Sequence, residues 1–433
     1  MGKIALLGAG SQGFGPQFLA DILSRPTLAR LPVALMDKSE ANLEIMVRLG
    51  KKMAVQLGVE PRFEPTTDRR RALDGADYVV ATVNAPGDRE GMRGVERRIS
   101  EKYGVNQAIG GDVGPGGVFL SIRYMPLLTA ICRDMEELCP NAWLLQYGND
   151  TATVAWALSR VSSIRTVGMC HSVQGTAAEL CRYAGVPFEE TGHWAAGVNH
   201  QAWYLRLEHK GRDMYPLLRE KMKDPVIYEK DPVRFEIMKH FGYFPSESSI
   251  HHSEFYAYFR KNPEMIARWT PNYLSGSGRD DRYMKDTARS REALRKEAFG
   301  DGPARIRTSD EYAIGIIEAM ETNRPYRFNG NVMNTGLITN LHYSCVEVPC
   351  LVDAMGVHPC WVGDLPEACA SLNRQKLAGM ALAVKGGLEG DAKAVEQAVA
   401  LDSLTAAMCT LDQVHDMVTE IIEAEKEFLP QFG

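Results

Sequence analysis

Cys170 and His171 stand directly after a short apolar run at residues 165–169, and a further histidine, His200, follows in the stretch GVNHQAW. A cysteine thiolate and a neutral imidazole suit a divalent transition metal: the thiolate favours zinc-like ions, and the imidazole also accepts manganese, iron, cobalt or nickel. Each residue alone has a simpler interpretation, because isolated cysteines and histidines are often ordinary core residues. The residue types therefore allow two interpretations: buried structural residues, or ligands of a metal ion.

A glycine-rich pattern opens the chain. Gly8, Gly10 and Gly13 form G-x-G-x-x-G after an apolar run and before a helical pattern. Such glycines allow a tight turn and a close approach to a pyrophosphate, which then lies at a helix N-terminus. Asp37 ends the next apolar run, where a carboxylate can accept hydrogen bonds from a ribose and repel a 2′-phosphate. We expect an NAD site rather than an NADP site, formed by Gly8, Gly10, Ser11, Gln12, Gly13, Asp37, Thr82 and Asn84.

Five short apolar runs must position these groups. They are apolar on both faces, as buried parallel strands are, and helical patterns separate them. The alternation predicts an α/β fold with a Rossmann-like doubly wound parallel sheet. Ligands bind beyond the carboxyl ends of such strands, so the polar groups that follow the runs should meet at one edge. The predicted strands are residues 3–7, 32–36, 78–83, 143–146 and 165–169.

With 433 residues, the chain is long enough for two domains. From about Asn199 the alternation gives way to mixed elements. We therefore expect an NAD-binding domain at residues 1–195 and a mixed α+β domain at residues 196–433, which would bind substrate and metal and support oligomerisation. One amphipathic helix is expected near the C-terminus, where apolar residues recur every three or four positions: Leu404, Met408, Leu411, Val414, Val418 and Ile421.

The composition excludes several partners. A net charge of -6 argues against DNA or RNA binding, which relies on basic surface. No uninterrupted apolar run reaches the roughly 18 residues of a membrane helix, and the N-terminus lacks a signal-peptide pattern. We expect a cytoplasmic, non-membrane protein. Nine cysteines without close paired spacing predict reduced and mostly buried thiols.

Four stretches together resemble glycoside hydrolase family 4, the NAD- and manganese-dependent glycosidases with a sheet domain akin to that of lactate and malate dehydrogenases. They are GAGS (8–11), GDVGPGG (111–117), GMCHSVQGT (168–176) and GVNH (197–200). The stretch CHSVQGT is most similar to the α-galactosidase branch. The similarity continues through residues 242–259, 329–340 and 345–357, so it covers nearly the whole chain.

The resemblance implies that Cys170 and His200 bind the metal, manganese or another divalent ion. It also implies that His171 is the general acid. Asn149 would touch the sugar hydroxyls, and we expect Asn199 to contact the substrate as well. Asp150 replaces the proline that follows this asparagine in the family, which adds a carboxylate beside the sugar site.

The base that takes the C2 proton is harder to assign. Relatives that act on phosphorylated sugars use a tyrosine in the region equivalent to residues 246–258. Here we favour His251, as a base or an additional metal contact, with Glu254 next, and we expect His252 at the surface.

The implied reaction is hydrolysis of a non-phosphorylated α-glycoside, most similar to an α-galactoside. In the family's mechanism, NAD oxidises C3, the metal stabilises an enolate, the aglycone is eliminated, and water addition and re-reduction follow. Alternative substrates are α-glucosides, α-galacturonides or α-glucuronides, and rarer α-hexosides. Outside the family, an NAD-dependent 2-hydroxy-acid dehydrogenase and a noncatalytic NAD sensor remain open. The family and the C-terminal helical pattern both suggest a homodimer or homotetramer.

Overall fold

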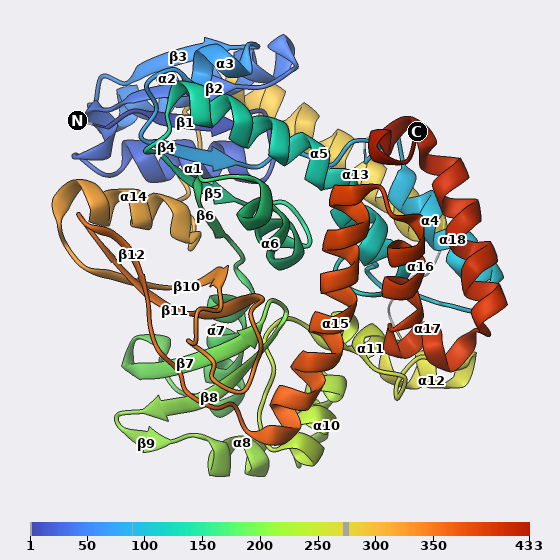
Figure 1. Ribbon diagram of the computed structural model, residues 1–433. Helices are drawn as coiled ribbons and strands as arrows, with labels where there is room; N and C mark the ends of the chain where they lie inside the picture. Colours follow the sequence, from blue (N-terminus) through green and yellow to red (C-terminus); the bar gives the residue numbers. More distant parts are fainter. Residues whose placement is uncertain (1, 89, 272–276) are drawn as a thin grey trace.

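The computed structural model describes residues 2–88, 90–271 and 277–433 (Figure 1). Its N-terminal part is a parallel sheet in the order β3-β2-β1-β4-β5-β6. This is the order of the doubly wound dinucleotide-binding fold, so the predicted fold class is confirmed. The strands are β1 (Ile4–Leu7), β2 (Pro32–Met36), β3 (Arg62–Thr66), β4 (Tyr78–Ala81), β5 (Trp143–Gln146) and β6 (Arg165–Gly168).

All five predicted strands are present, and two of them have the predicted bounds. The register aligns their carboxyl ends, since Leu7 pairs with both Met36 and Ala81 and Gln146 pairs with Gly168. Helices connect the strands: α1 (Phe14–Leu23), α2 (Glu40–Leu57), α3 (Arg69–Leu73), α4 (Met92–Lys102), α5 (Gly114–Leu138), α6 (Thr151–Val161) and α7 (Ser172–Ala184).

The sheet continues beyond β6 with antiparallel strands, in the order β10-β11-β7-β8-β9, and β12 pairs with β11. The expected boundary after residue 195 therefore lies inside β7, within one continuous sheet, and the division into two domains stays a prediction. These strands are β7 (Thr191–Val198), β8 (Gln201–His209), β9 (Arg212–Asp213), β10 (Tyr326–Met333), β11 (Cys345–Asp353) and β12 (Gly356–Pro359).

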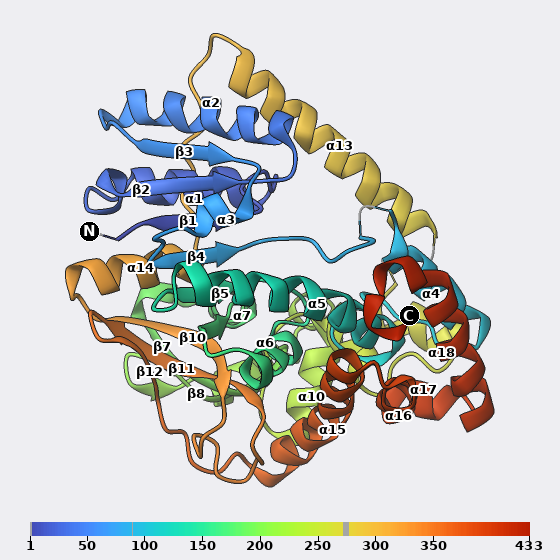
Figure 2. The same cartoon turned by 45° about the horizontal axis from the view of Figure 1, so that its top comes forward.

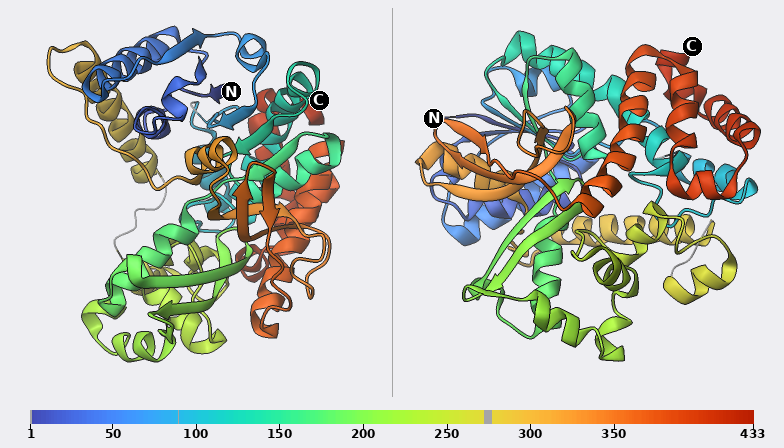
Figure 3. Two further views of the ribbon diagram at one scale, coloured as in Figure 1. Left: turned by 90° about the vertical axis from the view of Figure 1, so that its left-hand side faces the viewer. Right: turned by 60° about the horizontal axis from the view of Figure 1, so that its bottom comes forward.

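Helices of the second half surround this sheet. The C-terminal end of helix α13 (Ser277–Phe299) packs against α2, and the helix extends from there towards α4 (Figure 2). Helices α15 to α18 gather beside α4 and α5, away from the N-terminal strands (Figure 3). The remaining bounds are α8 (Tyr215–Lys221), α9 (Pro225–Tyr228), α10 (Pro232–Phe241), α11 (Ser249–Phe255), α12 (Pro263–Trp269), α14 (Tyr312–Thr322), α15 (Glu367–Glu389), α16 (Ala392–Ala400), α17 (Ser403–Met408) and α18 (Leu411–Glu425).

The prediction of one C-terminal amphipathic helix is wrong, because the apolar stripe spans two helices. Thr410 separates α17 from α18 and caps α18 in a reciprocal arrangement with Gln413. This capping box supplies the hydrogen bonds that a new helix start needs, so the chain begins a second helix there. Leu404, Val414, Val418 and Ile421 are buried as expected, whereas Leu411 at the break is exposed.

Within the described residues, α5 is long and apolar enough to cross a membrane by length and composition. However, 78% of its most apolar window is buried inside the protein, as in a core helix. The expectation about cysteines is confirmed in the structure, where all nine are free and seven are buried.

Candidate active site

The loop after β1 and the end of β2 form the predicted nucleotide cradle. The N–H of Gly10 donates to Oδ2 of Asp37 at 3.1 Å, and the N–H of Ser39 donates to Oδ1 at 2.9 Å. A Cβ atom on Gly10 would lie 2.6 Å from Asp37 Oδ2, and one on Gly8 would lie 2.7 Å from the carbonyl oxygen of Thr82. Only glycine fits both positions, because a side chain at either one would collide with the residue that follows β2 or β4.

The other predicted nucleotide contacts surround this cradle. The Thr82 hydroxyl donates to the carbonyls of Leu7 and Gly8 at 3.3 and 3.2 Å, which fixes the carboxyl end of β1. The Ser11 hydroxyl accepts from the Phe14 N–H, and Gly13 is the residue before α1. Gln12 is half-buried, and Asn84 is exposed after β4.

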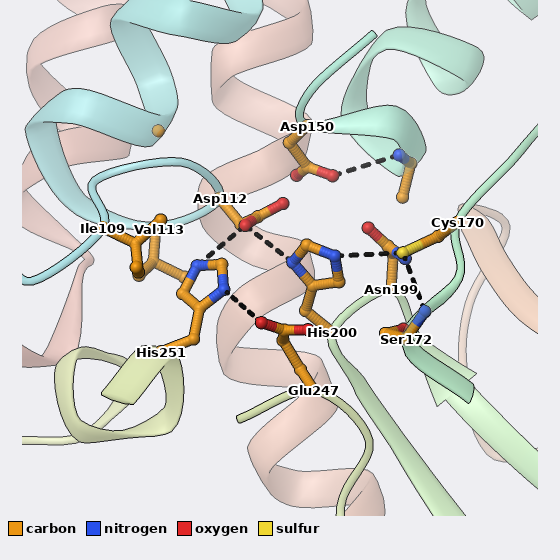
Figure 4. Close-up of polar contacts among 12 residues, drawn as sticks. Ile109, Asp112, Val113, Asp150, Cys170, Ser172, Asn199, His200, Glu247 and His251 are labelled. Carbon is orange, nitrogen blue, oxygen red and sulfur yellow. Dashed lines mark hydrogen bonds and ion pairs between the residues drawn. The ribbon is translucent and has the colours of Figure 1, made fainter. Parts of the chain in front are cut away.

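Cys170 and His200 meet at the same edge of the sheet (Figure 4). Cys170 follows β6, and His200 lies in the turn between β7 and β8. The Sγ of Cys170 lies 3.1 Å from Nε2 of His200, and both residues are buried. Ligands with bonds of about 2.3 Å to sulfur and about 2.1 Å to nitrogen lie about 3.1 Å apart when they bind one ion at right angles. The pair therefore fits a shared cation.

Sequence reasoning missed Asp112, which lies two residues before the start of α5. Its Oδ2 lies 2.7 Å from Nδ1 of His200 and 2.8 Å from Nε2 of His251. Burial opposes ionisation of Asp112, but the two imidazoles outweigh it and hold the pKa of the carboxyl well below its usual range. A carboxylate on the second nitrogen of a metal-binding histidine fixes the orientation of the ring. The motif GDVGPGG contains Asp112, but nothing in the sequence pairs it with the histidines.

His251 lies on α11, with its ring edge-on to that of His200 at 4.9 Å between centroids. Its Nδ1 lies 3.4 Å from Oε1 of Glu247. Burial lowers the pKa of His251, but Asp112 and Glu247 outweigh burial and raise it to about 9. Asp112, His200 and His251 together form a buried group whose ligand atoms lie within 4.8 Å of one another.

Glu254 and His252 lie on the same helix, and Oε1 of Glu254 lies 3.4 Å from Nε2 of His251. The Glu254 carboxylate accepts the N–H groups of Ala108, Ile109 and Gly110 at 2.7 to 3.2 Å, so it holds the loop that leads to Asp112. The expectation that His252 is a surface residue is wrong. His252 is fully buried, and its Nε2 lies 2.7 Å from the Ser246 carbonyl oxygen, because α11 is enclosed on that face too.

His171 is the exposed histidine of the site, with 66% of its side chain accessible. Its Nδ1 lies 3.1 Å from Oε1 of Glu311, the residue before α14. This hydrogen bond raises the pKa of His171 to about 9. The imidazole is therefore protonated near neutral pH and can donate a proton.

The three predicted sugar-binding residues have different surroundings. Asn149 is half-buried after β5. Asp150 is buried, and its carboxylate accepts from the Ala152 N–H at 3.0 Å and from the Thr153 hydroxyl at 2.7 Å, which caps α6. Asn199 is buried beside His200 and donates from Nδ2 to Oε2 of Glu347 at 3.3 Å. Burial raises the pKa of Glu347 to about 7.

Several buried polar atoms near the Cys170–His200 pair have no hydrogen-bond partner among the described residues. Buried polar groups are usually satisfied, so such a cluster indicates room for a bound group. The atoms are Asp112 Oδ1, Ser172 Oγ, Asn199 Oδ1 and Glu347 Oε1.

Two site residues have backbone conformations that favour glycine. His200 has φ of 59° and Glu247 has φ of 79°. Such conformations are costly for residues with side chains and persist where surrounding contacts impose them, which is common at functional sites.

Comparisons with known proteins match nearly the whole chain to one family. The family model described as Family 4 glycosyl hydrolase matches residues 3–186, and the model of its C-terminal domain matches residues 195–405. The chain is 34% identical to an alpha-galactosidase of Bacillus subtilis (strain 168) over the full length of both chains. It is also 34% identical to an alpha-galactosidase of Rhizobium meliloti (strain 1021), covering all of this chain and 90% of that protein.

Solved structures share the whole fold. The crystal structure of lplD from Bacillus subtilis has a TM-score of 0.86 at 23% identity and covers 97% of this chain and 99% of that one. A 6-phospho-alpha-glucosidase from gut microorganisms, solved in complex with NAD and Mn2+, has a TM-score of 0.80 at 22% identity and covers all of both chains. At these identities the likeness shows the fold.

Proposed function

Because the chain belongs to family 4 of the glycosyl hydrolases, we propose that it hydrolyses non-phosphorylated α-glycosides, with α-galactosides as the first choice. The two alpha-galactosidases that match its full length support this substrate. The observation that carries the chemistry is the contact of 3.1 Å between Cys170 Sγ and His200 Nε2 at the sheet edge that also holds the glycine loop.

The residues present fit a divalent metal ion. Cys170 and His200 would hold it, and Asp112 would orient His200 through Nδ1. The unsatisfied oxygens of Asp112 and Asn199 supply further polar atoms nearby. Manganese is the proposed ion, because a relative with the same fold was solved with Mn2+.

The residues also fit NAD. The loop of Gly8 to Gly13 would hold the pyrophosphate, and Asp37 at the end of β2 would accept the ribose hydroxyls. The negative charge of Asp37 disfavours a 2′-phosphate, which supports NAD over NADP. Ser11, Gln12, Thr82 and Asn84 border the same loop and strand ends.

Bound NAD supplies reversible hydride acceptance, and a bound cation supplies electrophilic stabilisation of charge on a sugar carbonyl. The protein's own groups move protons. His171, protonated through Glu311, would donate to the leaving oxygen at C1. His251 lies beside His200 and shares Asp112 with it, so it stays the proposed base for the C2 proton. With a pKa of about 9, it must lose its own proton before it can accept that one.

The contacts of Glu254 and Asp150 support other roles for these residues. Glu254 is occupied by three backbone N–H groups, which favours loop positioning over proton transfer. Asp150 uses both carboxylate oxygens to cap α6. Asn149 and Asn199 remain the proposed sugar contacts.

The test is turnover of a panel of aryl α-hexosides by the full chain with NAD, Mn2+ and a thiol, run in deuterated water. We expect hydrolysis of the galactoside, deuterium at C2 of the product, and no accumulation of NADH. Cys170→Ser should lose metal-dependent turnover while keeping its thermal unfolding temperature.

Formation of one NADH for each 2-hydroxy acid oxidised would instead indicate a dehydrogenase. NAD binding without deuterium exchange would indicate a sensor. A different preferred hexoside would leave the family chemistry intact and overturn only the galactoside choice.

A further inference from the structure

A buried row of residues crosses the junction between the parallel and antiparallel halves of the sheet. Asn331 on β10 pairs with Gly168 on β6 and with Glu347 on β11, and Glu347 pairs with Gly197 on β7. The two outer strands of this row lead to the candidate metal ligands, since Cys170 follows β6 and His200 follows β7. The row therefore lies next to the turn that carries His200.

Glu347 is the acidic member of the row and contacts that turn. Its side chain is fully buried, and Oε2 accepts from Nδ2 of Asn199 at 3.3 Å. Asn199 directly precedes His200. A buried carboxylate in a sheet is costly unless it makes specific contacts, and this is the side-chain hydrogen bond that the described residues give Glu347.

Lys376 on α15 also contacts Asn199, from another side. Its Nζ donates to the Asn199 carbonyl oxygen at 2.7 Å and lies 4.7 Å from the centroid of the Phe255 ring. Asn199 is thus fixed by its side chain and by its backbone, through groups from two different elements.

The turn needs such restraint. His200 has left-handed backbone torsions, with φ of 59°. Gly197 has φ of 154°, and a Cβ there would lie 2.7 Å from the Gln201 carbonyl oxygen. A tight hairpin with a non-glycine residue in this conformation persists only where its neighbours impose it.

We propose that Glu347 and Lys376 are positioning residues that hold the β7–β8 turn and thereby direct Nε2 of His200 towards Cys170. This inference rests on the metal site of the proposed function. Neither residue is among the proposed metal ligands, and both contact Asn199, through which they would act.

The test measures Mn2+ affinity by calorimetry on the purified full chain, in a thiol-containing buffer, without substrate. Glu347→Ala and Lys376→Met should each raise the Kd for Mn2+ about 10- to 100-fold, the range typical for residues that orient a metal ligand. Glu347→Gln keeps an acceptor oxygen of the same shape and should stay within about threefold of wild type. With Co2+ as a spectroscopic probe, the Cys170 thiolate band should weaken in the first two variants.

Asn329→Ala is the matched control. Asn329 is a buried residue of the same sheet whose Nδ2 donates to the Ala195 carbonyl at 2.8 Å, away from the turn. Its Mn2+ affinity should stay within about twofold of wild type, the scatter expected for a site without shared partners. Thermal unfolding of each variant confirms that the protein is folded.

The proposal is overturned if Glu347→Ala and Lys376→Met bind Mn2+ as tightly as wild type. It also fails if Asn329→Ala weakens binding equally, or if Glu347→Gln is as weak as Glu347→Ala. A wild-type chain that binds no Mn2+, or a Cys170→Ser variant that binds it normally, would instead refute the metal site itself and this inference with it.

Discussion

The two nitrogens of the His200 imidazole have different partners, and one of them, Nδ1, lies 2.7 Å from Oδ2 of Asp112. The contact joins a strand turn to the loop before α5, although the residues are far apart in the sequence. It fixes which nitrogen of His200 is left to face Cys170.

Replacing Asp112 with asparagine should weaken metal binding. The variant keeps the side-chain shape but loses the charge that orients both His200 and His251, so we expect the Kd for Mn2+ to rise about 10- to 100-fold. Calorimetry with the full chain measures this. Asp402→Asn is the matched control, because Asp402 caps α17. If Asp112→Asn binds Mn2+ as tightly as wild type, Asp112 does not orient the metal-binding histidine.

Replacing Asp37 with serine should change nucleotide selectivity. Loss of a charge-assisted hydrogen bond to the ribose costs about 1.5–3 kcal/mol, which corresponds to about a 10- to 100-fold higher Kd for NAD. The Kd for NADP should rise less or fall, because the repulsion of its phosphate is removed. Fluorescence titration with the reduced forms, NADH and NADPH, measures the change in selectivity. Asp68→Ser, which alters the exposed cap of α3, should change neither. A parallel loss of affinity for both nucleotides would contradict the role of Asp37 in selectivity.

Replacing His171 with asparagine should lower kcat/KM, and the loss should be larger for substrates with a poorer leaving group. A general acid contributes about 10²- to 10⁴-fold when the leaving oxygen needs a proton, and little when it leaves as a stable phenolate. We expect a loss in that range for an alkyl glycoside and less than about tenfold for a dinitrophenyl glycoside. His209→Asn is the control. It breaks a comparable exposed contact, with Glu190 at 2.9 Å, and should leave kcat/KM unchanged for both substrates. Equal losses for both leaving groups would exclude His171 as the acid.

A buried ion cluster far from the site predicts pH-dependent stability. Arg123 contacts Glu96 and Glu425, all three being buried. Burial and the neighbouring Glu96 raise the pKa of Glu425 to about 10, above its ordinary value of 4.5. A carboxyl with a raised pKa stabilises the fold fully below its unfolded pKa, and this contribution is lost as the pH rises towards the folded pKa.

Glu425→Gln does not titrate, so its stability relative to wild type should increase between pH 5 and pH 9. We expect a gain of at least about 1.4 kcal/mol over that range, the free energy of one pKa unit. Thermal unfolding at several pH values measures it. Glu423→Gln removes an exposed ion pair with Lys426 and should show no such trend. A difference between Glu425→Gln and wild type that is constant with pH would contradict the raised pKa.

The parallel strands were predictable because their residues are apolar on both faces, and a buried strand needs little other information. The carboxyl ends then follow from the fold, which is why Cys170, Asn149 and Asp37 could be placed at one edge. The break at Thr410 was missed because the apolar spacing runs across it, whereas the capping box with Gln413 is a local signal that the sequence contains.

The contacts of the site were less predictable. Asp112 reaches His200 and His251 only through tertiary packing, and no spacing rule links these three positions. Asp150, which we expect beside the sugar, caps α6 with its carboxylate oxygens, a role that aspartate before a helix commonly has, and its contact with the sugar stays a prediction. The burial of His252 depends on how α11 packs, which sequence periodicity over seven residues does not determine.

The order of strands in the sheet differs from their order along the chain: β10 and β11 lie between β6 and β7, but are synthesised much later. Before β10 and β11 are synthesised, β6 and the β7–β8 hairpin can be linked through α7, which packs on the hairpin, but not through a continuous sheet. Non-local pairing of this kind is slow, because a long loop must close before any contact forms. The sheet that joins the strand before Cys170 to the hairpin of His200 can therefore become continuous only after most of the polypeptide has been synthesised.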